Sequence, residues 1–214
     1  MNNPNLNSTI FIPYYSGNIK FTKCIGYCSL QQFINAHKKP NNITLETIKE
    51  IQLTESLEAK RKLKQTLFSF TPALKIEVGG VRKLVNAKCF TGLAQLDFDK
   101  IESIEKAHDL KEYLFTTYQC VVCAYISPSG KGVKCLIRIT VPRDIHHYRA
   151  IYKTIEKEFE QLGYFDKATR NAILPLFLSY DKDIYSRDFS EAVAWDKEDW
   201  LVEQKVNVKI AYSH

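Results

Sequence analysis

The sequence predicts an α+β fold, in which an antiparallel sheet covered by two helices follows a smaller α/β region. Three observations indicate this class. The 214 residues are 45% hydrophobic, with only 8 Gly and 7 Pro, so the chain can bury an ordinary core. In the second half, apolar stretches with strand-like and helix-like spacing follow one another in the order β-α-β-β-α-β. Gly79-Gly80 marks a turn beyond which the pattern changes, and we therefore expect two regions, 1–85 and 86–214.

The first region is expected to contain short strands and then helices. Strands are predicted at residues 10–15 and 24–27, and a short helix at 29–37. From Thr44, the expected N-cap, apolar residues at helical spacing predict one long helix or two short ones. The cations Arg61, Lys62 and Lys64 come near its end, where the helix dipole favours positive charge.

The second region is expected to form the larger sheet. Its predicted elements are a strand at 93–99, a helix at 101–117, a strand at 120–127, a turn at 128–132, a strand at 133–141, a helix at 145–162 and a short apolar segment at 173–180. This order is that of the ferredoxin-like or RNA-recognition-motif arrangement, in which two helices cover one face of an antiparallel sheet. There, the first strand lies between the third and the fourth and runs antiparallel to both.

Charge is distributed unevenly along the chain. Residues 1–90 contain 13 Lys or Arg against 5 Glu and no Asp, a net charge of +8, and residues 91–214 contain 17 against 19, a net charge of −2. The imbalance predicts one region for phosphates and one for acidic chemistry. The chain lacks both an apolar run of about 18 residues and a signal-peptide pattern, which predicts a soluble cytoplasmic protein without a membrane partner.

Most of the cysteines lie in apolar, strand-like stretches and are expected to be buried free thiols. They are Cys24, Cys28, Cys89, Cys120, Cys123 and Cys135. Zinc held by the first two together with Cys120 and Cys123 is an alternative, which the absence of loop residues around Cys120-Val-Val-Cys123 disfavours. The five histidines lack the spacing of zinc ligands and are expected at the surface.

Two acidic residues stand out in Leu96-Asp97-Phe98-Asp99. Residues two apart in a strand share a face, so Asp97 and Asp99 point the same way, while Leu96 and Phe98 point into the core. Paired carboxylates without nearby His or Cys favour a hard ion such as Mg²⁺ or Mn²⁺. The alternative is that the two residues only mark the exposed end of the strand.

The turn Ser127-Pro128-Ser129-Gly130-Lys131-Gly132 joins two apolar strands. A plain hairpin is one interpretation. Its hydroxyls and cations, with Lys134 just beyond it, favour instead a site for phosphates, although a strand follows where a Walker loop requires a helix. The predicted topology brings this turn to Asp97, Asp99 and the segment before the last strand, where Asp166 and Arg170 lie. Three carboxylates beside a basic turn match a two-metal phosphoryl-transfer site.

These motifs resemble the archaeo-eukaryotic primase superfamily, in particular its primase-polymerase-like branch, the VirE amino-terminal-domain family. The resemblance covers roughly residues 60–188. It is carried by the stretches 62–68, 71–72, 91–93, 96–99 and 127–134, by Asp166, and by 178–181 with Tyr185. The Ser-Pro-Ser-Gly-Lys-Gly sequence after an Asp-x-Asp strand is the most specific of them.

The resemblance implies a template-dependent DNA primase-polymerase of mobile-element or phage-type replication. Such a nucleotidyltransferase joins NTPs or dNTPs to a 3′-hydroxyl on single-stranded DNA, and its helicase would here be a separate polypeptide. The metals would be held by Asp97, Asp99 and Asp166. The phosphates of the nucleotide would be bound by Ser129, Gly130, Lys131, Gly132, Lys134 and Arg170. The template would lie on Arg61, Lys62 and Lys64.

Two positions depart from the family pattern. Lys134 stands where the wider superfamily has His, and Leu174 stands where the branch has Arg, a role that Arg170 could take over. Leu174 therefore keeps open a non-catalytic nucleic-acid-binding module on the same scaffold. A metal-dependent nuclease is a third interpretation, which leaves the phosphate-binding turn unexplained. Asp181 and Asp183 are expected to form a turn.

Overall fold

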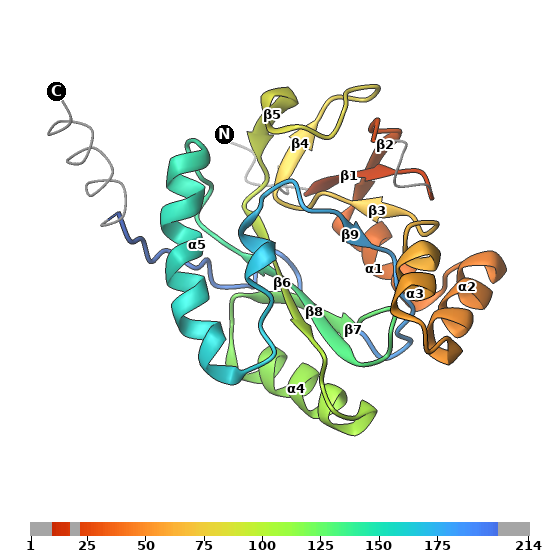
Figure 1. Cartoon of the computed structure of the whole chain (residues 1–214). Helices are drawn as coiled ribbons and strands as arrows, with labels where there is room; N and C mark the ends of the chain where they lie inside the picture. Colours follow the sequence, from red (N-terminus) through yellow and green to blue (C-terminus); the bar gives the residue numbers. More distant parts are fainter. Residues whose placement is uncertain (1–9, 18–21, 201–214) are drawn as a thin grey trace, which may run out of the picture.

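The computed structural model describes residues 10–17 and 22–200, which form an α+β fold, as expected (Figure 1). The strands are β1 (Phe11–Tyr15), β2 (Gly26–Ser29), β3 (Ser69–Phe70), β4 (Leu74–Ile76), β5 (Ala87–Phe90), β6 (Leu93–Asp99), β7 (Val121–Ile126), β8 (Gly132–Arg138), β9 (Leu176–Phe177) and β10 (Tyr185–Ser186). The α-helices are α1 (Leu30–Lys38), α2 (Asn42–Leu53), α3 (Leu57–Lys64), α4 (Ile104–Thr117) and α5 (Ile145–Phe159). Short 3₁₀ helices are η1 (Leu84–Asn86), η2 (Glu160–Leu162) and η3 (Lys167–Arg170). None of the described helices is long and apolar enough to cross a bilayer.

The helices of the first region begin at side-chain caps. Ser29 accepts a hydrogen bond from the Gln32 amide, and the Gln32 side chain bonds back to Ser29, which completes a capping box. Asn41, rather than the expected Thr44, caps α2, because its side chain accepts from the Thr44 amide. Ser56 starts a separate helix in the same way, so the predicted helical stretch is two helices, α2 and α3.

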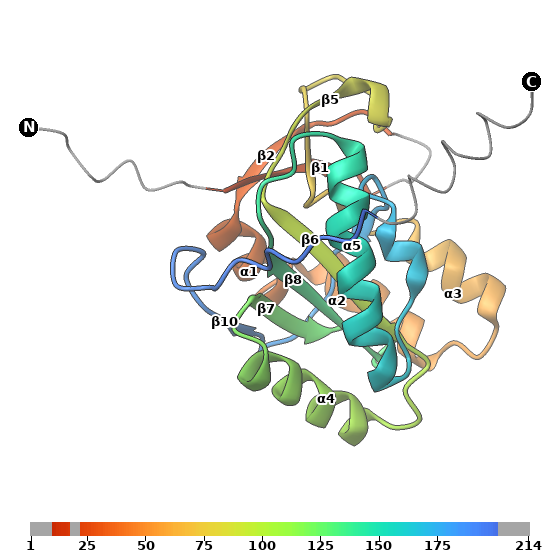
Figure 2. The same cartoon turned by 90° about the vertical axis from the view of Figure 1, so that its left-hand side faces the viewer.

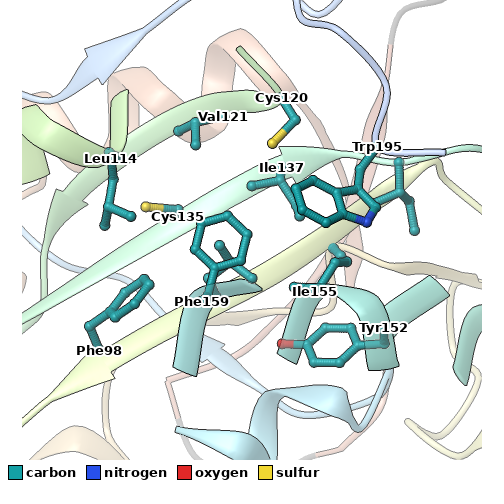
Figure 3. Close-up of a cluster of buried hydrophobic side chains, with 14 of the residues drawn as sticks. Phe98, Leu114, Cys120, Val121, Cys135, Ile137, Tyr152, Ile155, Phe159 and Trp195 are labelled. Carbon is teal, nitrogen blue, oxygen red and sulfur yellow. The ribbon is translucent and has the colours of Figure 1, made fainter. Parts of the chain in front are cut away.

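Both faces of the sheet β10-β7-β8-β6 are buried. On one face, α4 and α5 pack against the alternating apolar side chains of the strands, and Figure 3 shows Tyr152, Ile155 and Phe159 of α5 directed at them. On the other face lie residues of β1, α1 and β3, which Figure 2 shows behind the strands. Because both faces are covered, β7 is buried along its whole length and its sequence is almost continuously apolar.

The register of β6 places the acidic residues opposite the basic turn. In the antiparallel pair of β6 and β8, Asp97 lies opposite Lys134 and Asp99 opposite Gly132. Leu96 and Phe98 are buried in the core cluster on the side of α4 and α5. The predicted strand at 93–99 and the predicted orientation of its side chains are therefore confirmed.

The last predicted strand lies elsewhere. In the segment 173–180, β9 pairs with β3 in a second sheet, ordered β2-β1-β3-β9, and β10 joins β7 at the opposite edge of the larger sheet. At the free edge of β6 there is a single bridge, between Phe98 and Phe165. The chain does not continue along β6 beyond Phe165, because the next residue, Asp166, caps the helix η3. The Asp166 carboxylate accepts a hydrogen bond from the Ala168 amide at 2.9 Å.

Strand pairing connects the two regions expected from the sequence. β5, which follows residue 85, forms a two-stranded sheet with β4, and β9 pairs with β3 near the other end of the chain. The division at residue 85 stays a prediction.

The thiols of the six cysteines are free. Cys24, Cys120, Cys123 and Cys135 are buried, as expected, and Cys28 is half-buried, but Cys89 on the two-stranded sheet is exposed. Burial raises the pKa of Cys120 to about 11.

A buried ion pair joins α4 to the segment before β10. The Lys111 ammonium lies 2.8 Å from the Asp181 carboxylate, and the same carboxylate oxygen accepts from the Ile126 amide of β7 at 2.9 Å. The other oxygen of Asp181 accepts a hydrogen bond from the Asp183 amide at 3.0 Å. This bond closes the turn that was predicted for the two residues. One carboxylate therefore connects a helix, a strand and a turn.

His37 is buried, although the histidines were expected at the surface. Its ring centroid lies 4.2 Å from that of Phe33 and 4.4 Å from that of Tyr125, and burial lowers its pKa to about 4. His147 is also buried and contacts Glu198 at 2.8 Å, whereas His108 and His146 are exposed; His214 lies outside the described residues. His37 is buried because it lies on the same face of α1 as the buried residues Leu30, Phe33 and Ile34.

Acid is expected to destabilise the protein through His37. In the unfolded chain the His37 imidazole has a pKa of 6.5, whereas in the folded protein it binds a proton only near pH 4. The stability that the neutral, buried ring provides is therefore lost as the pH falls from 6.5 towards 4. At pH 5 the loss amounts to about 2 kcal/mol. Urea unfolding of the wild type and of His37→Phe at pH 7 and pH 5 measures this loss. If the free energy of unfolding has the same pH dependence in both proteins, the prediction is wrong. His108→Phe is the surface control.

Candidate active site

Three carboxylates from two separate segments meet at the edge of the larger sheet. Asp97 and Asp99 extend from the end of β6, and Asp166 lies beside them because its amide donates to the Asp97 carbonyl at 2.8 Å. One oxygen of each carboxylate lies within 4.8 Å of the others. Asp97 is 8% exposed, while Asp99 and Asp166 are half-buried. The convergence expected from the topology is therefore confirmed.

The Asp97 carboxylate is paired on one side only. Its Oδ2 forms an ion pair with the Lys134 ammonium, and its Oδ1 has no hydrogen-bond partner in the part of the chain that the structure describes. Burial, with smaller contributions from Asp99 and Asp166, raises the pKa of Asp97 to about 6, although Lys134 acts in the opposite direction. The site thus holds more negative charge than Lys134 alone can balance.

The donor set fits a hard divalent cation. All three ligand groups are carboxylates, which Mg²⁺ and Mn²⁺ prefer, and the buried Oδ1 of Asp97 is an available ligand atom. Within residues 10–17 and 22–200 this is the one group of three or more His, Cys, Asp or Glu side chains close enough to share an ion. The thiols considered for zinc do not form such a group there.

The turn between β7 and β8 lies directly against Asp99. A Cβ atom on Gly132 would lie 2.8 Å from the Phe98 carbonyl oxygen, 2.9 Å from Asp99 Oδ1 and 2.9 Å from Ser127 Oγ. Glycine at this position therefore permits the close approach of the turn and the carboxylate.

The interior of the turn is held by its own hydrogen bonds. The Gly130 amide donates to the Ser127 carbonyl at 2.9 Å, and Gly130 has a φ of +76°, which favours glycine. The Gly130 amide is thus used within the turn, contrary to its expected role as a phosphate donor. The hydroxyls of Ser127 and Ser129 lie 3.0 Å apart, and Lys131 is exposed.

The three cations at the end of α3 separate in space. Lys62 pairs with Glu58 at 2.7 Å in an exposed position, and Arg61 is exposed as well. Lys64 is half-buried: burial lowers its pKa, whereas the charges of Asp99 and Asp97 raise it. Lys64 thus belongs to the surroundings of the carboxylates. The sequence offered no signal for this, because the three cations are adjacent in one helical turn.

Position 174 borders the site from the side of β6. Gln95 shares the face of Asp97 and donates from Nε2 to the Leu174 carbonyl at 3.2 Å, while its Oε1 has no partner among the described residues. The alternation Gln95, Asp97, Asp99 could have identified this side chain as part of the site. Leu174 itself is half-buried and brings no charge.

Arg170, which the sequence offers in place of the expected arginine, is the last residue of η3. It lines a cleft against α5, and the described residues that line this cleft do not include the three carboxylates. Asp166 and Arg170 lie at opposite ends of η3, so the short helix directs them to different places.

Comparison with known proteins gives one match. The model of the BT4734-like, N-terminal domain family matches residues 45–185, a span that includes the three carboxylates, the turn, Lys64 and Leu174. The chain matches no curated protein and no solved structure.

Proposed function

For this chain, which belongs to the BT4734-like, N-terminal domain family, we propose a metal-dependent nucleotidyltransferase that acts on a nucleic-acid template, as primase-polymerases do. The observation that carries the proposal is the convergence of Asp97, Asp99 and Asp166 within 4.8 Å, next to Lys134 and the glycine turn. Carboxylates that share metal ions beside bound phosphates are the usual arrangement for phosphoryl transfer.

The fold supports a palm of the RNA-recognition-motif type. β8 lies between β6 and β7, the bridge from Phe98 to Phe165 adds an antiparallel contact on the other side of β6, and α4 and α5 pack on one face. In the RNA-recognition-motif arrangement the third strand likewise lies between the first and the second, so β6, β7 and β8 correspond to its first three strands. The fourth strand is reduced to the bridge, which leaves room for η3 and Asp166 at the site.

Each residue has a distinct role in this proposal. Asp97, Asp99 and Asp166 would hold Mg²⁺ or Mn²⁺, which when bound would neutralise the phosphates and activate a 3′-hydroxyl. Lys134 balances Asp97 in the free protein and, with Lys64, binds the triphosphate as it enters. The 3′-hydroxyl loses its proton to water as its oxygen forms a bond to the α-phosphorus. The bond from this phosphorus to the bridging oxygen breaks, and pyrophosphate leaves with that electron pair. Ser129 and Lys131 line the side of the turn open to the nucleotide.

Incorporation of labelled nucleotides tests the proposal. We expect products longer than the substrate when the protein is incubated with single-stranded DNA, Mn²⁺ or Mg²⁺ and nucleotides of both sugar types, and none in EDTA. Reactions with and without primer separate extension from initiation. Shortened DNA identifies a nuclease instead, and the proposal fails if bound template yields no product under any of these conditions.

Leu174 favours a second candidate, a nucleic-acid-binding module without turnover. With no cation at this position and Arg170 on the cleft against α5, the cations left for the triphosphate are Lys64, Lys131 and Lys134. Leu174→Arg separates the two candidates. It raises incorporation in a weak polymerase and leaves a pure binding module inactive. The separate helicase and the template contacts of Arg61 and Lys62 stay predictions.

A further inference from the structure

A cleft of about 800 Å³ lies between α5 and the segment that contains η3. α5 forms one wall, and the segment that contains η3 lies beside it (Figure 2). η1 and the chain at residues 199–200 complete the lining. Its lining includes Arg149, Tyr152, Arg170 and Trp200. This volume is in the range of small-molecule sites.

The cleft contains two arginines and one carboxylate, Glu156, for which no ion pair with another described residue is found. The Asp199 carboxylate forms ion pairs with two lysines. Its Oδ2 lies 3.3 Å from the Lys153 ammonium and 2.6 Å from the Lys157 ammonium. Arg149 of α5 and Arg170 of η3 are both exposed and form neither an ion pair nor a hydrogen bond with another described residue. Two free guanidinium groups on one cleft are well suited to a phosphate, because each offers forked donors.

The same cleft offers an apolar surface for a ring. Ile145, Ala150 and Ala172 contribute to its wall, together with the indole of Trp200. Trp200 is held in place, because its Nε1 donates to Glu198 at 2.7 Å and its ring stacks on His147 with centroids 5.6 Å apart. A planar base can therefore pack against the indole while its phosphates reach the arginines.

Hydrogen bonds connect the cleft to the backbone of β6 and to η3. The Tyr152 hydroxyl, at the cleft, donates to the Gln95 carbonyl at 2.9 Å and contacts Thr169 Oγ1 at 2.7 Å. Thr169 lies in η3 between Asp166 and Arg170. Asp166 caps the N-terminus of η3, and Arg170 is the last residue of the same short helix.

We propose that this cleft is a second nucleotide site, which binds phosphate through Arg149 and Arg170 and a base against Trp200. The ligand is a phosphate ester that carries a base, either a free nucleoside triphosphate or the 5′-phosphorylated end of a strand. The site is independent of the proposed polymerase chemistry, because none of its phosphate ligands belongs to the carboxylate cluster.

Binding without metal tests the inference separately from catalysis. In EDTA, we expect ATP or a 5′-phosphorylated oligonucleotide to quench tryptophan fluorescence and to saturate in equilibrium dialysis. A 5′-hydroxyl oligonucleotide is expected to bind at least about tenfold more weakly than its phosphorylated form. ATP and the two oligonucleotides distinguish the two sources of the phosphate.

The variants assign the binding to the cleft. Arg149→Gln and Arg170→Gln are each expected to raise the Kd by about tenfold or more, which corresponds to one lost charge-assisted hydrogen bond. Lys106→Gln on α4, and Asp97→Asn combined with Asp99→Asn, are expected to leave it unchanged. Loss of binding in the double Asp variant, equal binding by all variants, or no saturable binding at all overturns the inference.

Discussion

Asp97→Asn and Asp99→Asn are each expected to lower nucleotide incorporation by roughly 10³-fold or more, equivalent to about 4 kcal/mol of transition-state stabilisation. Each change removes one charged oxygen from a cluster whose ligand atoms lie within 4.8 Å of one another. Weaker metal binding leaves the triphosphate charge unbalanced. The rate of product formation at saturating nucleotide measures the effect, and Asp109→Asn, an exposed residue of α4, is the matched control.

Stability distinguishes a lost ligand from a damaged fold. The pKa of Asp97 is raised to about 6, so its folded carboxylate is favoured as the neutral acid, and above pH 6 its charge reduces the stability of the metal-free protein. At pH 8, Asp97→Asn is therefore expected to raise the free energy of unfolding, by up to about 3 kcal/mol. Mn²⁺ is expected to raise the Tm of the wild type and not that of the variant. A variant that loses both activity and stability contradicts this assignment.

Lys111→Met is expected to lower the free energy of unfolding by about 3–5 kcal/mol. The side chains of Lys111 and Asp181 are 2% and 5% exposed, and Lys111 also donates to the Asp183 carbonyl at 3.0 Å. Without the ammonium, the Asp181 carboxylate remains buried with only amide donors, of Ile126 and Asp183. Urea unfolding at pH 7 measures the loss.

An exposed pair on the same helix supplies the control. Lys106 lies 3.5 Å from Glu102 with 61% of its side chain exposed, so Lys106→Met is expected to cost less than about 1 kcal/mol. Adding Asp181→Asn to Lys111→Met removes the uncompensated charge and is expected to recover part of the loss. If Lys111→Met costs no more than Lys106→Met, the buried pair does not have the proposed stabilising role.

The parts of the site that could be predicted lie on strands with clear period-two patterns. β6 has the predicted bounds, and its alternation put Asp97 and Asp99 on one face. The pairing of β6 with β8 could be predicted as well, from the order of the elements. It brings Lys134 opposite Asp97 and Gly132 opposite Asp99. Asp166 was found through the same topology, although this stretch of the chain pairs with β6 only at the bridge of Phe165, just before it, and the segment expected to pair there joins β3 instead.

Other parts depend on packing between distant segments. Lys64 and Arg61 look equivalent in the sequence, but in the structure Lys64 is half-buried and feels the charges of Asp99 and Asp97, whereas Arg61 is exposed. Arg170 follows Asp166 by four residues and still faces another cleft, because η3 turns the chain. His37 is polar by type and buried by its position on the apolar face of α1.

The sequence by itself determined the order of the main elements, the strand that carries Asp97 and Asp99, and the basic glycine turn, because hydrophobic periodicity and turn chemistry are local. Only the tertiary structure decided which residues share a site: that 173–180 joins β3 rather than β6, that Lys64 lies in the surroundings of the carboxylates, and that Arg149 and Arg170 line one cleft. These contacts arise between segments far apart in the chain, and their free energy depends on burial and neighbouring charge, which a linear pattern does not contain.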